Sequence, residues 1–146
     1  MTDLSDFSRI GAADRGLSVA ISTRPDGTGQ ASVVNAGVID HPFTGRPAVG
    51  LVAAGRSRKL ANWRARPHAT VVAKTGWEWA AVEGPVDIVG PDDPHPEVDA
   101  ERLRVLLREV FVAAGGTHDD WDEYDRVMAA ERRAAVFVTV ERVYSN

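Results

Sequence analysis

The densest cluster of basic side chains in this 146-residue sequence lies in one short segment, GRSRKLANWRARP, which follows an apolar run. The segment begins with a glycine, and its five basic residues are Arg56, Arg58, Lys59, Arg64 and Arg66. Backbone N–H groups in the first turn of a helix are unpaired, and together with Arg and Lys side chains they bind anions such as phosphate. The segment therefore predicts a phosphate site, and a solvated basic face is an alternative that the residues alone leave equally open.

The composition excludes several other chemistries. The 21 acidic and 17 basic residues give a net charge of -4, which argues against a general nucleic-acid binder, whose affinity comes from neutralised phosphates. The chain has no cysteine, so disulfides, thiolate catalysis, Cys-ligated zinc and iron–sulfur clusters are excluded. Metal ligands usually recur at helical or hairpin spacing, and no i,i+4 pair occurs among the four histidines. We therefore expect no metal site at His41, His68, His95 or His118.

The apolar pattern predicts the elements that must position the basic segment. Alternating or continuous apolar runs predict strands over residues 17–23, 30–39, 48–53, 69–74, 79–89 and 134–143. Helical spacing and breakers predict helices over 5–14, with Ser5 as N-cap, 57–66, with Ser57 as N-cap, 97–113 and 119–131. The Gly84-Pro85 pair indicates a bulge or an edge in the fifth strand. Trp121 and Tyr124, three residues apart in the last helix, are interpreted as core or interface anchors.

This order of elements predicts a mainly β fold in a single domain over residues 1–146. We expect a six-stranded antiparallel split β-barrel with a short helix after the third strand and two helices before the last strand. A parallel βαβ sheet fits less well, because only the last connection is long enough to hold a crossover helix. The N-terminal residues contain no apolar run of signal-peptide length, and no later stretch would span a bilayer. We therefore expect a cytoplasmic protein that binds neither membrane nor nucleic acid.

Segments along nearly the whole chain resemble the flavin or deazaflavin oxidoreductases of the pyridoxamine 5′-phosphate oxidase-like split-barrel family. Asp26-Gly27 followed by Gln30 to Asn35 resembles the family's first hairpin. Arg56 to Lys59, with Asn62 and Pro67, resembles its R-x-[RK]-K-x-x-N-x-x-x-x-P phosphate segment. The stretches GWEW into VEG, starting at residue 76, and HDDWDEY into ERR, starting at residue 118, resemble the actinobacterial branch that uses coenzyme F420.

The resemblance implies a homodimer with two equivalent sites at the subunit interface, each holding coenzyme F420 or, as the alternative, FMN. Carried over by position, it implies that the cofactor is bound by Gln30, Asn35, Val52, Ala53, Arg56, Ser57, Arg58, Lys59, Asn62, Trp77 and Trp79. Within this set, Arg58 and Lys59 would contact the phosphate, while Ser57 and Asn62 would support it by hydrogen bonds. Val52 and Ala53 would line the ring, Gln30 and Asn35 would face the pocket, and the two tryptophans would form a wall. Asn35-Ala36-Gly37 places small residues where many relatives carry bulky ones, which would admit a larger substrate.

Three functional hypotheses follow from the resemblance. The first is an F420-dependent reductase that transfers a hydride between the reduced deazaflavin and a small conjugated or heteroaromatic substrate, biliverdin-like tetrapyrroles included. The second is an FMN-binding enzyme similar to pyridoxamine phosphate oxidase, and the third is a non-catalytic carrier of F420 or another flat ligand. In the first two the cofactor supplies the chemistry, so the sequence assigns no catalytic acid or base.

Overall fold

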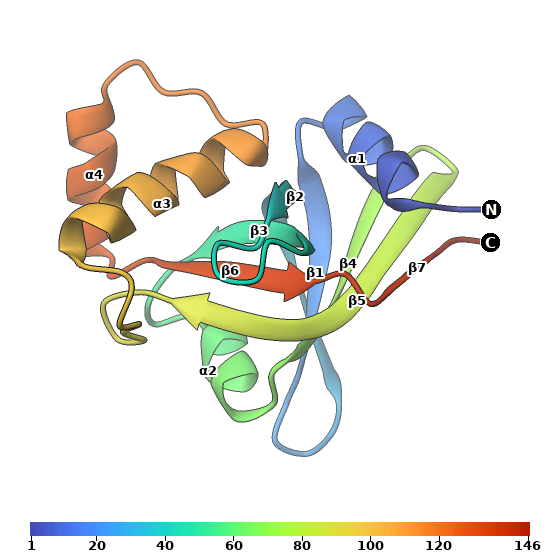
Figure 1. Ribbon diagram of the computed structural model, residues 1–146. Coiled ribbons are helices and arrows are strands. Elements are labelled where there is room, and N and C mark those ends of the chain that lie inside the picture. The colour runs from blue at the N-terminus through green and yellow to red at the C-terminus, as the bar shows by residue number, and fades with distance from the viewer.

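The computed structural model describes all 146 residues and has one antiparallel sheet of seven strands, the first six of which close into a barrel (Figure 1). The strands are β1 (Leu17–Thr23), β2 (Gly29–Asp40), β3 (Pro47–Ala53), β4 (His68–Thr75), β5 (Glu78–Val89), β6 (Ala134–Thr139) and β7 (Arg142–Tyr144). Their order is β4-β1-β2-β3-β6-β5-β7, and a further pairing of β4 with β5 closes the barrel. The helices are α1 (Leu4–Ala13), α2 (Arg58–Ala65), α3 (Ala100–Ala113) and α4 (Trp121–Ala130). The predicted mainly β barrel is confirmed.

The two longest strands change partners half-way along, which gives the barrel its split form. Strand β2 pairs with β1 up to Asn35 and with β3 from Ala36 onward. Strand β5 pairs with β4 up to Pro85 and with β6 from Val86 onward. The Gly84-Pro85 pair therefore marks a change of partner at a corner of the barrel.

The last predicted strand, 134–143, is in fact two strands. Strand β6 pairs with β3 and β5 inside the barrel, whereas β7 pairs only with β5 and lies outside it. The chain turns between them where it crosses Gly84, and a Cβ at that glycine would lie 1.7 Å from the Thr139 carbonyl oxygen. The prediction carried the strand on to Val143, although the charged residues Glu141 and Arg142 interrupt the apolar run after Val140.

Two hydrophobic cores lie on the two sides of the barrel wall. Inside the barrel, side chains of the strands pack with Phe7 and Ile10 of α1 and with Leu60 and Trp63 of α2. On the outer face, α3 and α4 cover β3 and β6 in a second core that includes Phe137. All six residues of β6 are buried, because alternate side chains enter opposite cores.

The predicted helices are confirmed, but three of them begin elsewhere. The N-cap of α1 is Asp3, in a reciprocal capping box with Asp6, rather than the predicted Ser5. Helix α3 begins after the N-cap Asp99, three residues later than predicted, because residues 95 and 98 form an extended bridge. Helix α4 begins after Asp120, whose carboxylate accepts a hydrogen bond from the backbone N–H of Glu123.

Helices α3 and α4 are held together as a pair by polar contacts at their interface. The Asp125 carboxylate of α4 accepts hydrogen bonds from Arg108 and Arg104 of α3, at 2.9 and 3.1 Å. The Tyr124 hydroxyl donates to the Leu107 carbonyl at 3.0 Å, and the Arg108 guanidinium lies 5.2 Å from the centre of the Trp121 ring. None of the four helices has the length and apolarity that crossing a bilayer requires.

Candidate cofactor site

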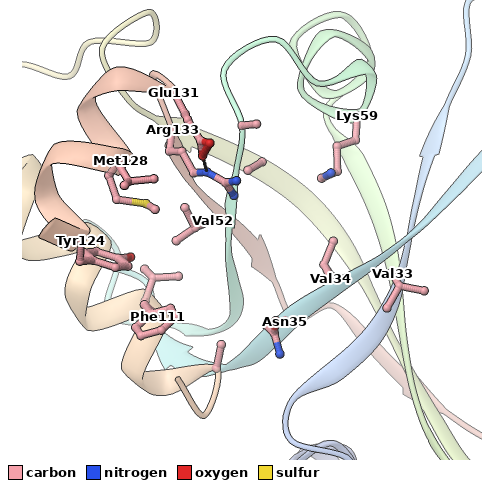
Figure 2. Close-up of a pocket in the computed structure, with 15 residues that line it drawn as sticks. Val33, Val34, Asn35, Val52, Lys59, Phe111, Tyr124, Met128, Glu131 and Arg133 are labelled. Carbon is pink, nitrogen blue, oxygen red and sulfur yellow. Dashed lines mark hydrogen bonds and ion pairs between the residues drawn. The ribbon is translucent and has the colours of Figure 1, made fainter. Parts of the chain in front are cut away.

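A cavity of ≈ 570 Å³ lies where the outer face of the barrel meets the α3–α4 pair and the start of α2 (Figure 2). Most of its lining is apolar and comes from five elements and the residues next to them, namely β2 (Val33, Val34, Asn35), the end of β3 with the next residue (Val52, Ala53, Ala54), α2 (Lys59), α3 with its C-cap (Val110, Phe111, Ala114) and α4 (Tyr124, Val127, Met128). Glu131 and Arg133, in the turn between α4 and β6, complete it. A volume of this size and an apolar lining with a few polar groups are typical of cofactor pockets.

The charged groups of the cavity are two cations, Lys59 and Arg133, and one carboxylate, Glu131. Lys59 makes no hydrogen bond or ion pair, and burial together with the positive charge of Arg133 lowers the pKa of its ammonium group. Arg133 donates from Nε to Glu131 Oε1 at 2.8 Å. A half-buried lysine without a counter-ion is costly, and an anion bound beside it would remove that cost.

The start of α2 adds further unpaired donors beside Lys59. No chain acceptor receives the backbone N–H groups of Arg58, Lys59 and Leu60. The Ser57 side chain stands at the predicted N-cap position but makes no capping hydrogen bond, and its buried Oγ has no partner. Ser57 therefore holds the predicted N-cap position, but the predicted capping hydrogen bond is absent. The N–H groups at the N-terminal end of α2 stay available to bind an anion.

The five basic residues of the predicted cluster separate into two groups. Arg64 pairs with Asp93, with 2.7 Å between Nη2 and Oδ1, and Arg66 donates from Nε to the Thr23 carbonyl at 2.8 Å. Both have structural roles. The other three, Arg56, Arg58 and Lys59, form no ion pair within the chain, and Arg56 lines a cavity of ≈ 420 Å³ that shares Ala54 and Glu131 with the first.

Of the other predicted cofactor contacts, Asn35, Val52 and Ala53 line the cavity, whereas Gln30 and Asn62 do not. Gln30 and Asn35 lie five positions apart on β2, an odd spacing, so their side chains point to opposite faces of the strand. The Asn62 amide donates to Ser22 Oγ at 3.0 Å and to Gln30 Oε1 at 3.2 Å. These residues form a network that ties α2 to β1 and β2 beneath the phosphate segment.

The two predicted wall tryptophans lie at the hairpin between β4 and β5, and neither lines the cavity of its own chain. Trp77 has 98% of its surface exposed, and Trp79 packs edge-on against Tyr144 with ring centres 6.3 Å apart. Their role as a cofactor wall stays a prediction, and it requires a second subunit.

The small residues that follow Asn35 do not enlarge the cavity. Ala36 is buried, and a Cβ at Gly37 would lie 1.9 Å from the Ala113 carbonyl oxygen. The C-terminal end of α3 fills the space that the missing side chain leaves. Ala36 and Gly37 line a neighbouring cavity of ≈ 400 Å³ instead, so the expectation that the small residues of Asn35-Ala36-Gly37 admit a larger substrate stays a prediction.

Sequence reasoning missed the residues that α3, α4 and the following turn bring to the cavity. Phe111, Tyr124 and Met128 follow the apolar helical spacing, which signals packing rather than a site. Burial raises the pKa of Tyr124 to about 12, and its hydroxyl is engaged with a backbone carbonyl. Glu131 and Arg133 belong to a segment that the resemblance included, but nothing in the sequence placed them beside Lys59.

No model of a protein family matches the sequence, but solved structures match nearly the whole chain. A conserved hypothetical protein, Rv2991 from Mycobacterium tuberculosis, is 19% identical, with a TM-score of 0.68 over 98% of this chain and 83% of the other. An F420 reductase is 16% identical, with a TM-score of 0.63 over 99% and 98% of the two chains. A pyridoxamine 5′-phosphate oxidase-related, FMN-binding protein from Nostoc punctiforme is 11% identical, with a TM-score of 0.63 over 95% and 78%.

This chain has the split-barrel fold of the pyridoxamine 5′-phosphate oxidase-like proteins. At these identities the likeness establishes the fold of the split barrel and not the ligand. The fold predicted from the resemblance is therefore confirmed, and the choice of cofactor has to be argued from the cavity.

Proposed function

We propose that this split barrel binds coenzyme F420 by its phosphate and acts in the cytoplasm as an F420-dependent reductase. The substrate would be a small conjugated or heteroaromatic compound, and biliverdin-like tetrapyrroles belong to this class. The observation that carries the proposal is the unpaired, half-buried ammonium group of Lys59 at one end of an apolar cavity, beside the free N–H groups of α2. The likeness to an F420 reductase over almost the full length of both chains supports it.

The cavity suits a molecule with a flat apolar ring and an anionic end. Valine and alanine side chains of β2 and β3 face the Phe111 side of α3 across it, and a planar ring would pack between them. Lys59 lines the other end. There it would hold a phosphate by charge-assisted hydrogen bonds, together with Arg58, which is exposed next to it at the start of α2.

When bound, reduced coenzyme F420 supplies a hydride. The chain's own contribution is to bind the phosphate, to orient the ring against β2 and β3, and to exclude water with the side chains of α3 and α4. Tyr124 and Glu131 are both engaged within the chain, at Leu107 and Arg133. The proposal assigns no side chain as proton donor, and the product would take its proton from solvent.

We further propose that the protein is a homodimer whose second subunit covers the cavity. Val33 lines the cavity and keeps 69% of its surface exposed, and Trp77 is almost fully exposed. Large apolar side chains in such positions are typical of a protein interface. Analytical ultracentrifugation over a range of concentrations tests this directly, and a monomer at all micromolar concentrations would contradict it.

The decisive experiment for the cofactor is a titration of the purified protein into coenzyme F420 and, separately, into FMN. The proposal expects fluorescence quenching of F420 at lower protein concentration than that of FMN. Tighter binding of FMN, or a yellow protein with an FMN-like absorbance spectrum as purified, would favour the FMN enzyme.

A second assay separates a reductase from a carrier. The protein is mixed with reduced F420 and a panel of acceptors that includes biliverdin, and oxidation of the coenzyme is followed by its absorbance. Oxidation that depends on both protein and acceptor is the expected result. Tight binding without oxidation across the panel would favour the carrier and contradict the reductase.

A further inference from the structure

The turn between α4 and β6 carries an arginine whose donor groups are only partly used. Arg133 donates one hydrogen bond from Nε to Glu131, and its two terminal nitrogens make none. Figure 2 shows the guanidinium inside the cavity, on the side that faces Lys59. The free terminal nitrogens form the fork that binds two oxygens of a phosphate or carboxylate at once.

This turn is fixed against the start of the phosphate segment. The backbone N–H of Gly55 donates to the Glu131 carbonyl at 3.1 Å. A Cβ at Gly55 would lie 2.5 Å from the Arg132 carbonyl oxygen, so only glycine allows the two turns to approach this closely. Arg132 itself has a left-handed backbone, with φ of 49°, and its side chain pairs with Asp92 away from the cavity. The two turns therefore form one unit, and Arg133 alone of the two adjacent arginines lines the cavity.

We propose that Arg133 is the second anion-binding residue of this site, facing Lys59 across the bound group, and that Glu131 is the positioning residue that orients its fork. The inference rests on the proposed function and deepens it, because it assigns the phosphate to a clamp made by two distant parts of the chain. Two like charges facing the same apolar cavity repel each other, and an anion between them converts this repulsion into binding. The ligand end would be a phosphate monoester, as in FMN, or a phosphodiester with a carboxylate beside it, as in F420.

The test measures how much the phosphate contributes to binding, through two matched ligand pairs. We call two ratios of dissociation constants the phosphate preferences. One is the value for riboflavin divided by the value for FMN, and the other is the value for the phosphate-free 8-hydroxy-5-deazaflavin divided by the value for F420. For Arg133→Gln we expect each phosphate preference to fall about tenfold or more, the scale of one charge-assisted hydrogen bond. Arg133→Lys keeps the charge but loses the fork, so it should recover only part of the loss.

Glu131→Gln separates positioning from simple electrostatics. Removal of a carboxylate beside a phosphate site would by itself strengthen anion binding, whereas loss of the group that orients Arg133 would weaken it. The inference expects the phosphate preference to fall, and a rise would overturn the positioning role. Arg126→Gln is the matched control, because Arg126 is exposed on α4, forms no ion pair and does not line the cavity. It should leave both preferences unchanged.

The outcomes distinguish this inference from the proposed function. If the unmodified protein binds neither FMN nor F420 better than the phosphate-free partner, both proposals fail. If it prefers the phosphorylated ligands and Arg133→Gln keeps that preference, only the clamp is overturned. Thermal melting of each variant shows whether it folds, and if Arg133→Gln does not fold, Arg133→Lys and Glu131→Gln decide the question by the same ratios.

Discussion

Replacing Lys59 with methionine should weaken cofactor binding while leaving the protein at least as stable. Methionine keeps most of the apolar stem of lysine and removes only the charged end. Burial and Arg133 lower the pKa of this ammonium group, which means that the folded chain disfavours its charge. The residue therefore has a cost in stability that ligand binding offsets, and the substitution separates the two effects.

The binding loss follows from the missing charge-assisted hydrogen bond. Such a bond to a charged group contributes about 1.5–3 kcal/mol, so the dissociation constants of F420 and FMN should rise about 10- to 150-fold. Riboflavin binding should change little, because riboflavin has no phosphate. The melting temperature without added cofactor should stay the same or rise.

The pH dependence of stability gives a second signature of the same charge. Because the pKa of Lys59 is lower in the folded chain than in the unfolded one, the unfolded state holds this proton more tightly. The free energy of unfolding should therefore rise with pH between the lowered value and the ordinary value near 10.5, and Lys59→Met should lack this component. Chemical denaturation at several alkaline pH values measures it. Unchanged affinity for F420 and FMN together with a lower melting temperature would refute the reasoning, since it would make Lys59 a structural residue.

Three further predictions concern the framework around the cavity. Trp121→Ala should lower the free energy of unfolding by about 2 kcal/mol, measured by urea unfolding of the dilute monomer. The loss is smaller than for a fully buried tryptophan, because the Trp121 side chain is only partly covered. Trp77→Ala, at an exposed position, should change it by less than about 0.5 kcal/mol. Gly37→Ala should cost about 1–3 kcal/mol or more, because its Cβ would meet backbone at 1.9 Å, while Gly29→Ala, with its closest contact at 3.6 Å, should be close to neutral in the same assay. Asp125, with 16% of its side chain exposed, has its pKa lowered by arginine hydrogen bonds. Its contribution is therefore present above the unfolded pKa near 3.9 and is lost as pH falls through the lower folded value, so Asp125→Asn should destabilise at pH 7 and progressively less in acid.

The strands were predictable because each one carries a local pattern that survives in the structure. Half-buried strands alternate, and β6 is a continuous apolar run because both of its faces are covered. The separation of β7 from β6 was not predictable: Glu141 and Arg142 interrupt the apolar run after Val140, but the turn depends on a crossing at Gly84, which is far away in the sequence. Nor was the start of α3, because Val98 fits the helical spacing while a bridge to His95 keeps it extended.

The candidate site was predictable where it is local in the chain and not where it is assembled from distant parts. Lys59 could be found because it stands at a strand-to-helix junction among other basic residues. Arg133 lies 74 residues later beside a second arginine, and the sequence does not say which of the two enters the cavity. That choice depends on the left-handed backbone of Arg132 and on its pairing with Asp92. Gln30 could have been set apart from Asn35, because an odd separation on one strand puts them on opposite faces.

An acidic protein can hold a positive site where nearby carboxylates are paired with other arginines, and the linker between β5 and α3 provides two such pairs. Asp92 pairs with Arg132, and Asp93 pairs with Arg64. Arg132 is next to Arg133 in the sequence, and Arg64 is close to Lys59, but each pairs with a linker carboxylate and does not line the cavity. The linker therefore balances the structural arginines and leaves the cavity cations for a ligand. By this reasoning Asp93→Asn, which frees Arg64 beside the phosphate segment, should strengthen the binding of FMN and F420 but not of riboflavin. Equal effects on phosphorylated and unphosphorylated ligands would show that the linker has no part in setting the charge of the site.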